Sequence, residues 1–330
     1  MIYWLSRLII ACFALAGVNN ADATDTDKKL AASLHAKYDL LQDKLHNSQF
    51  QKPLHLDSSE KSGTVAGDMY ALIDHSFATV STALHVPTHW CDILILHLNT
   101  KYCHASATSQ GTVLNVNIGK KYDQPLDETY RVNFDYQVAT KTPNYLQVKL
   151  NADKGPISTR NYSIMLEAIP LEKGRTFIHL AYSYAYGFAG QLAMQAYFST
   201  IGSDKVGFTV VDKESEGQPV YIGGMRGLVE RNTMRYYLAI EAFLGALSSP
   251  PQAQLEKRLL DWFTAVERYP RQLHEMERNE YLEMKRKEYL RQHSESPTAM
   301  AIPNNKGNFW AINALIREQP QSLTNSYRIL

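Results

Sequence analysis

RGLVERNTMRYYLAIEAFLGAL, residues 226–247, is the stretch that decides the fold. It follows Gly223-Gly224, where the chain can turn sharply, and it ends before Pro250-Pro251, where no helix can continue. Its apolar residues recur at intervals of three, four and seven, the period of one helix face. They are Val229, Tyr236, Ile240, Phe243 and Leu247, with Met234, Tyr237, Leu238 and Leu244 widening the stripe. Because so wide a stripe needs a large cover, we expect a curved antiparallel sheet to wrap around this helix.

The residues before this helix supply the strands for such a sheet. Residues 130–138 are the clearest case: Tyr130, Val132, Phe134, Tyr136 and Val138 face one way and polar residues face the other. Residues 171–174, LEKG, predict a hairpin turn between two further strands. The other predicted strands are 65–73, 96–105, 112–118, 146–150, 161–169, 175–186, 205–211 and 219–222, the last two completing the sheet.

Helices complete the predicted order. Asp74 is expected to cap a helix that runs to about residue 84, and Pro87 to open a second short helix at its favoured first-turn position. Residues 188–201 predict a short helix or a compact loop. The predicted fold class is therefore α+β: a sheet, a long C-terminal helix and extra flanking helices.

Two flanking segments and a tail lie outside this core domain of residues 63–249. Residues 24–62 are polar and predict an N-terminal helical segment, with Leu30, Leu34, Tyr38, Leu41 and Leu45 at helical spacing. Residues 250–293 predict a charged helical extension, by default a solvated appendage. Its apolar residues would alternatively dock on the domain: Leu255, Leu259, Trp262, Phe263 and Val266. We expect residues 294–330 to form a partly ordered tail.

The composition bounds the function. The 330-residue chain has a formal net charge of +1, which argues against a large nucleic-acid footprint, since that requires clustered positive charge. Its aromatic residues are mostly tyrosines, 20 against 11 Phe and 4 Trp. Tyrosine places an apolar ring beside a hydroxyl, which suits a mixed polar and apolar cavity and equally suits half-buried strands.

The first 23 residues predict a secretory signal peptide. Arg7 supplies the positive charge, residues 8–18 form a short apolar run, and Ala21-Asp22-Ala23 fits a cleavage site. A retained anchor and a lipoprotein site at Cys12 are the alternatives. We therefore expect export, to the periplasm if the source is a Gram-negative bacterium.

Cys91 and Cys103 remain after the leader, an even count that favours a disulfide in an oxidising compartment. Two free buried thiols are a second interpretation. A metal site is a third, because His89, His97 and His104 lie in the same stretch, although the tight spacing of zinc sites is absent.

The order of a strand, two short helices, six or seven antiparallel strands and a long helix over residues 63–248 resembles the helix-grip fold of the START and SRPBCC superfamily, in its lipid-binding type. The resemblance rests on this order and on Gly223-Gly224 with the helix that follows. It implies a cavity between sheet and helix that holds a lipid or another hydrophobic small molecule.

The candidate ligand-binding residues lie on the inward rows and on the last helix: Tyr130, Phe134, Tyr136, Tyr182, Tyr184, Tyr186, Arg226, Tyr236 and Ile240. Alternatively the rings simply fill the core. Arg226 would pair with an anionic head group or be an ordinary surface arginine. His179 would be a core histidine or a polar contact.

Three functions follow from this pattern. The first is an exported, non-catalytic carrier or sensor of a hydrophobic molecule. The second is a cyclase- or hydrolase-like cavity enzyme that uses Glu167 and His179 as an acid–base pair. The third is an envelope interaction protein that docks through residues 252–293. Its partner would be the membrane or an envelope protein, contacted transiently. Because no nucleotide-, metalloprotease- or hydrolase-type motif occurs, we expect no cofactor and no metal, and we rank binding above catalysis.

Overall fold

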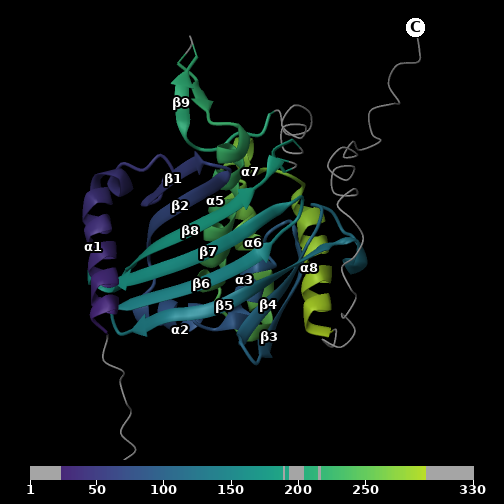
Figure 1. The fold of residues 1–330 in the computed structure, drawn as a ribbon, viewed down its shortest axis with the longest axis horizontal. Helices are drawn as coiled ribbons and strands as arrows, with labels where there is room; N and C mark the ends of the chain where they lie inside the picture. The colour runs from purple at the N-terminus through teal and green to yellow at the C-terminus, as the bar shows by residue number, and fades with distance from the viewer. Residues whose placement is uncertain (1–23, 189, 193–203, 215–216, 295–330) are drawn as a thin grey trace, which may run out of the picture.

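Eight antiparallel strands form one curved sheet in this computed structural model, which describes residues 24–188, 190–192, 204–214 and 217–294. The order across the sheet is β1-β2-β8-β7-β6-β5-β4-β3 (Figure 1). The strands are β1 (Leu54–Lys61), β2 (Thr64–Ile73), β3 (Thr100–Thr108), β4 (Gly111–Ile118), β5 (Tyr130–Thr142), β6 (Tyr145–Lys154), β7 (Thr159–Pro170) and β8 (Thr176–Tyr186).

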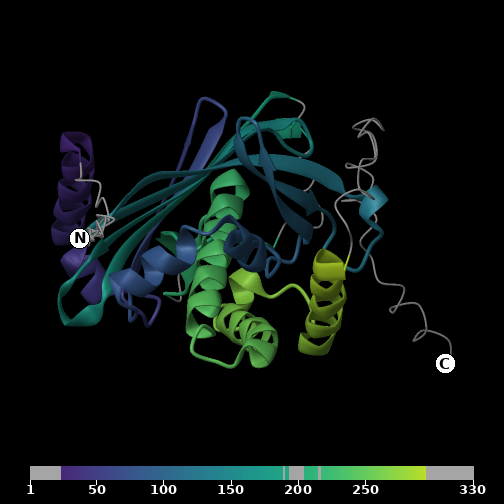
Figure 2. The same cartoon turned by 90° about the horizontal axis from the view of Figure 1, so that it is seen from below.

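The long helix α5 (Gly224–Gly245) lies against the concave face of this sheet (Figure 2). Its apolar stripe is buried as predicted, with Val229, Ile240 and Phe243 fully enclosed. The helix is also covered on its other sides, so even Glu230 and Arg231 are buried. The predicted α+β helix-grip architecture is confirmed.

Two short helices follow β2, as expected. α2 (Phe77–Leu84) begins two residues later than predicted, because Ser76 and not Asp74 caps it by accepting a hydrogen bond from the Thr79 backbone N–H. Pro87 opens α3 (Pro87–Leu94). The disulfide between Cys91 and Cys103 joins α3 to β3, which confirms the predicted pairing and removes both thiols from any metal site.

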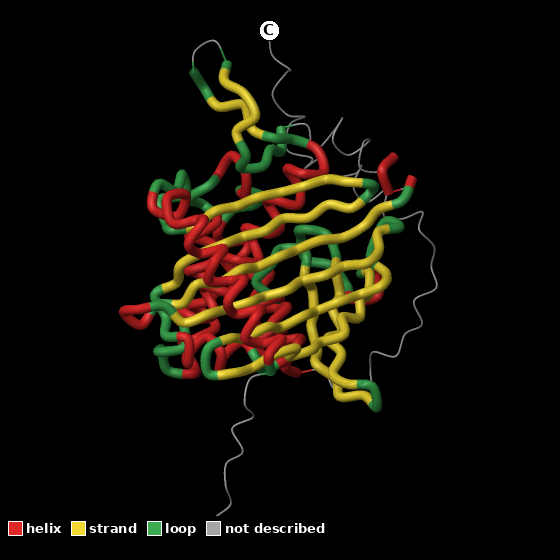
Figure 3. The backbone as a smooth tube through the Cα atoms, turned by 60° about the vertical axis from the view of Figure 1, so that its left-hand side comes forward, coloured by secondary structure: helices red, strands yellow, loops and turns green. Residues whose placement is uncertain are grey.

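Two predictions about the strands are wrong. β1 lies inside the segment predicted to be helical; its sequence, LHLDSSEK, is mostly polar because it is the edge strand and buries only Leu54 and Leu56. β9 (Val210–Lys213) and β10 (Pro219–Tyr221) do not complete the main sheet. They pair with each other in a separate ribbon that projects from one end of the molecule (Figure 3).

The charged C-terminal helices are packed onto the domain rather than solvated. They are α6 (Pro251–Val266), α7 (Pro270–Leu273) and α8 (Arg278–Ser294). Trp262 of α6 is buried and donates a hydrogen bond to the Arg235 carbonyl, and Tyr281 of α8 stacks on Trp262 at 4.9 Å between ring centroids. The apolar docking face predicted for this segment is therefore present, and the solvated-appendage interpretation is wrong.

A fully buried ionic cluster fastens α8 to β3. Glu288 accepts hydrogen bonds from Lys101 at 2.9 Å and from Lys285 at 2.7 Å, and all three side chains are inaccessible to solvent. Lys285 also donates to the carbonyls of His97 and Thr100. Burial lowers the pKa of Lys285 to about 8.

The N-terminal helix α1 (Asp25–His46) packs on the face of the sheet opposite α5. Only Leu34, Leu41 and Leu45 of the helix are buried, against Tyr70, Tyr145, Ile169 and Phe177 of the strands. This confirms the amphipathic helix predicted from the leucine spacing. Thr24 caps the helix through a reciprocal hydrogen-bond pair with Asp27.

The predicted signal peptide, the C-terminal tail from residue 295 and most of the predicted excursion at 188–201 lie outside the described residues. In the described part of the chain, no helix combines the length and apolar character needed to cross a membrane.

Candidate functional site

A cavity of about 140 Å³ lies between α5 and the sheet. It is lined by Pro156, Ile157, Thr159, Tyr162, Tyr182, Tyr184, Leu228 and Asn232. The residues come from the β6–β7 hairpin, from β7 and β8, and from the N-terminal half of α5. Because most of these side chains present carbon, the cavity is mainly apolar.

Three tyrosine rings form the sheet side of the cavity. Tyr162 and Tyr184 stack at 5.2 Å between ring centroids, and Tyr162 lies 6.4 Å from Tyr182. Burial raises the pKa of Tyr162 to about 12, although a hydrogen bond with Thr159 opposes this, and it raises the pKa of Tyr182 and of Tyr184 further. The hydroxyls therefore stay protonated and act as neutral hydrogen-bonding groups.

The hairpin at the cavity mouth holds an uncommon backbone conformation. Ile157 and Ser158 have φ values of 55° and 58°, at the centre of a tight turn. The Gly155 N–H donates to the Thr159 carbonyl, and the Thr159 N–H donates to the Pro156 carbonyl. A positive φ is unfavourable for a β-branched residue such as isoleucine. Because Ile157 lines the cavity, this turn places an apolar side chain at the mouth where Asn or Gly is more usual.

The structure brings two of the nine predicted ligand residues to this cavity, Tyr182 and Tyr184. Tyr236 adjoins it, packed between Tyr182 and His97 at 5.2 and 5.1 Å between ring centroids. Ile240 is fully buried farther along α5. The binding roles of these residues stay a prediction.

The other predicted residues lie elsewhere on the inner face or beyond it. On β5, Phe134 packs edge-on to Tyr162, Tyr136 donates to the Leu84 carbonyl, and Tyr130 is half-buried. At the end of β8, the Tyr186 hydroxyl donates to Glu60.

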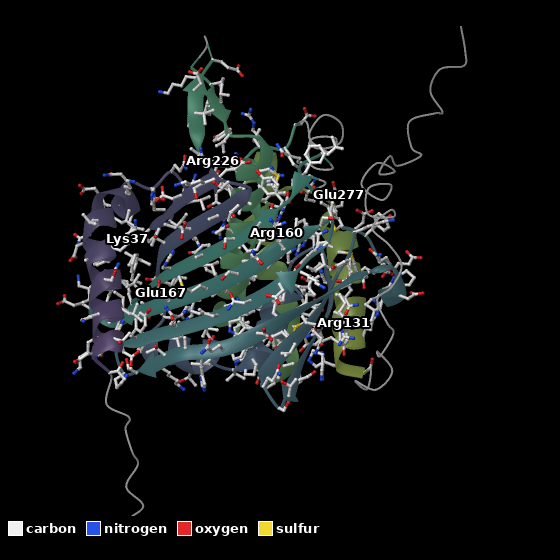
Figure 4. All side chains as sticks on the ribbon, in the orientation of Figure 1. Lys37, Arg131, Arg160, Glu167, Arg226 and Glu277 are labelled. Carbon is white, nitrogen blue, oxygen red and sulfur yellow. A yellow bond between two sulfur atoms is a disulfide. The ribbon has the colours of Figure 1, made fainter. Side chains whose placement is uncertain are left out.

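Arg226, near the start of α5, donates from Nε to the Ser58 hydroxyl of β1 at 3.1 Å (Figure 4). Arg226 is therefore occupied by the protein's own edge strand and does not line the cavity.

Sequence reasoning missed Tyr162, Asn232, Leu228 and the hairpin residues. Asn232 lies four residues before Tyr236, so it is a polar side chain within the apolar face of the helix, and this spacing was the available signal. The hairpin residues carried no comparable pattern, because their place at the cavity depends on long-range packing.

The cavity is small for the predicted guest. Pockets for drug-sized molecules run to about 300–1,000 Å³, whereas an apolar cavity of about 150 Å³ holds a single benzene ring. A second hollow of about 170 Å³ lies near the other end of α5. Its walls include the Lys52–Glu241 ion pair, Asp74 and His75, and none of the predicted ligand residues.

Glu167 and His179 do form a hydrogen-bonded pair, but on the face of the sheet turned away from α5. Nδ1 of His179 lies 2.9 Å from Glu167 and Nε2 lies 2.8 Å from Asp68, while Tyr145 and Gln147 also donate to Glu167. Figure 4 shows Glu167 on this outer face, which Lys37 of α1 adjoins. The cavity-enzyme hypothesis based on this pair is therefore corrected, since neither residue faces the cavity.

In the part of the chain that the structure describes, no group of three or more His, Cys, Asp or Glu side chains is arranged to hold a metal ion. His89 and His97, from the stretch around the cysteines, instead make local contacts: His89 bonds the Ala83 carbonyl, and His97 accepts from the Asn99 backbone N–H.

Comparison with known proteins found solved structures that are similar to this chain. No protein-family model matches the chain. No curated protein matches it. Norcoclaurine synthase from Thalictrum flavum is similar at 12% identity and a TM-score of 0.30, over 42% of this chain and 81% of that one. Zhui aromatase/cyclase from Streptomyces sp. R1128 is similar at 13% identity and a TM-score of 0.29, over 42% and 74%.

Ara h 8.0201 is similar at 12% identity and a TM-score of 0.32, over 58% of this chain and 99% of that one. The sheet order and the position of α5 define the helix-grip arrangement of this chain by themselves, and the chain is similar to these proteins in fold alone.

Proposed function

We propose that this protein binds a small hydrophobic molecule in the cavity between β7, β8 and α5, and carries or senses it without changing it. The observation that supports this is the cavity itself, a space of about 140 Å³ among three tyrosines, Leu228 and Ile157. Each Å² of apolar surface that a guest removes from water contributes about 25 cal/mol, so a ring-sized guest needs few polar contacts.

The size of the cavity favours a single-ring molecule over a whole lipid. A lipid would require the rings of Tyr162, Tyr182 and Tyr184 to move apart, and these rings are in mutual contact. The lipid carrier expected from the sequence is therefore the second form of this proposal, in which the interior opens.

Titration of the protein with ethylbenzene, followed by NMR, tests the proposal. The Leu228→Trp variant fills the cavity from α5 and is expected to weaken binding at least tenfold. Leu72→Trp is the matched control, because Leu72 is also half-buried but lines the second hollow. Absence of binding to the wild type, or equal binding by both variants, would overturn the proposal.

A fluorescent long-chain fatty acid forms the second arm of this experiment. If it binds more tightly than ethylbenzene and competes with it, the interior opens and the lipid form is supported. If it does not bind while ethylbenzene does, the single-ring form holds.

We also propose that the carrier is exported. The support is the signal-like sequence of residues 1–23 together with a disulfide, which persists in oxidising compartments. N-terminal sequencing of the protein from its source cells tests this: cleavage after Ala23 is expected, and an intact Met1 or Ile2 terminus would contradict it.

A further inference from the structure

One end of the cavity is polar, and this end deepens the proposed function. Asn232 lines the cavity, and behind it lie His97 and Arg235, both buried. His97 stacks on Tyr236, which packs edge-on against the cavity residue Tyr182. The guest would therefore meet this group of side chains if it carried a polar atom.

The hydrogen bonds of His97 define which of its nitrogens carries the proton. Nδ1 accepts a hydrogen bond from the backbone N–H of Asn99 at 3.2 Å, so its lone pair is in use. Burial and the nearby Arg235 hold the pKa of His97 well below its usual range, so the ring is neutral. In the neutral ring the hydrogen then resides on Nε2, which is a donor.

This donor is buried and makes no short hydrogen bond. A hydrogen-bond contact with the side chain of Asn232 partly offsets the lowering of the His97 pKa, and a second such contact of Asn232 lowers the pKa of Tyr182. The amide of Asn232 therefore lies between the imidazole of His97 and the cavity residue Tyr182.

The orientation of the Asn232 amide follows from Arg235. Nη1 of Arg235 lies 3.4 Å from Oδ1 of Asn232, so the amide oxygen is directed toward the guanidinium and the NH₂ group is at the other end. Asn232 thus presents its NH₂ donors on the side of the cavity residue Tyr182, whose pKa its side chain lowers.

The charged groups next to Asn232 carry a net positive charge, which also favours a hydrogen-bond acceptor. Glu275 pairs with Arg235 at 2.8 Å, Lys121 at 2.7 Å and Lys205 at 3.1 Å. Three cations around one carboxylate leave an excess of positive charge, and these cations overcome burial and lower the pKa of Glu275 to about 2. A donor-rich end with positive charge behind it favours an acceptor or an anion and disfavours another donor.

We propose that the guest of this cavity carries a carbonyl or carboxylate oxygen on a single apolar ring, and that this oxygen accepts a hydrogen bond from the amide of Asn232, backed by His97. This inference rests on the proposed function, because it concerns the same cavity. It restricts the guest to a small aromatic or alicyclic ketone, aldehyde or carboxylic acid.

Three probes of similar size test it: ethylbenzene, acetophenone and benzoate, titrated into the wild type by calorimetry or NMR. Acetophenone is expected to bind at least tenfold more tightly than ethylbenzene. Asn232→Leu removes the donors and is expected to abolish this preference while keeping ethylbenzene affinity. Tyr136→Phe is the matched control, because it removes a tyrosine hydroxyl that bonds the Leu84 carbonyl outside the cavity and leaves Asn232 in place.

A second variant keeps the test decisive if Asn232→Leu does not fold. Asn232→Asp has nearly the same shape but places a negative charge where the NH₂ group was, so benzoate binding is expected to fall more than tenfold. Equal binding of all three probes to the wild type would overturn this inference while leaving the proposed function in place. Failure of all three probes to bind would overturn both.

Discussion

Gly67 of β2 lies so close to Thr233 of α5 that a Cβ atom on the glycine would be 2.4 Å from the threonine hydroxyl oxygen. A glycine within a strand ordinarily weakens it, but here it permits close approach between helix and sheet. The threonine hydroxyl donates back to the Val229 carbonyl and is buried, so it has no free direction in which to move. This contact sets how deeply α5 lies in the concave face, and Thr233 directly follows the cavity residue Asn232.

Replacing Gly67 by alanine is expected to destabilise the fold by about 1–3 kcal/mol, because the added methyl group overpacks this contact. Urea unfolding measures the change. Gly245→Ala is the control, since a Cβ at Gly245 meets only Asp261 at an ordinary 3.9 Å. A Gly67→Ala variant as stable as the wild type would show that the helix can shift without cost.

The buried cluster between β3 and α8 leads to a second prediction. Replacing Glu288 by glutamine leaves Lys101 and Lys285 buried without a countercharge, and we expect a loss of about 3–5 kcal/mol in unfolding free energy. The matched control is Glu283→Gln on the same helix, where the ion pair with Lys287 is exposed and its removal should leave stability nearly unchanged. Similar unfolding midpoints for the two variants would contradict this reasoning.

Much of this fold can be predicted from the sequence wherever one face of a strand is exposed to solvent and the other face is buried. β5 shows this best, because its alternation of Tyr, Val and Phe with polar residues is visible without any tertiary information. The long helix was equally clear from its apolar spacing and its flanking glycines and prolines.

The failures have physical causes too. β1 lacks alternation over most of its length because an edge strand buries little, and the ribbon of β9 and β10 carries exposed Val210 and Val211, which imitate a core strand. The alternation along β8 places His179 on the face opposite Tyr182. The predicted pairing with Glu167 nevertheless suggested an acid–base role in the cavity. Asn232 was missed because only the packing of sheet on helix shows that this polar residue faces a cavity.

The His179 cluster leads to a pH prediction. Burial alone would lower the pKa of His179, but the hydrogen bonds to Asp68 and Glu167 outweigh it and raise the pKa above 6.5. A raised folded-state pKa contributes stability that is fully present below 6.5, the value for the unfolded chain, and is lost as pH rises through the folded-state pKa. The unfolding free energy should therefore contain a component that decreases above pH 6.5.

Urea unfolding between pH 5 and 9 measures this component. His179→Gln removes the titrating group, so the variant should be less stable than the wild type at pH 5 and the difference should shrink toward pH 9. His85→Gln, which alters a half-buried histidine bonded to the Ser81 carbonyl, is the control and should keep the wild-type slope. A pH-independent difference between His179→Gln and the wild type would remove the proposed linkage.

The disulfide leads to the last prediction. Cys91 and Cys103 are separated by 12 residues, and the bond ties α3, which packs against α5, to β3 near the far edge of the sheet. Closing a loop of this size restricts the unfolded chain and is worth about 2–3 kcal/mol. Cys91→Ser with Cys103→Ser should lower the unfolding free energy by this amount in non-reducing buffer.

A reductant should shift the unfolding free energy of the wild type toward that of the double variant but leave the variant itself unchanged. Because both sulfur atoms are buried, reduction should be slow in the native state and fast in urea. A wild type that responds to reductant no differently from the double variant would show that this bond does not stabilise the fold.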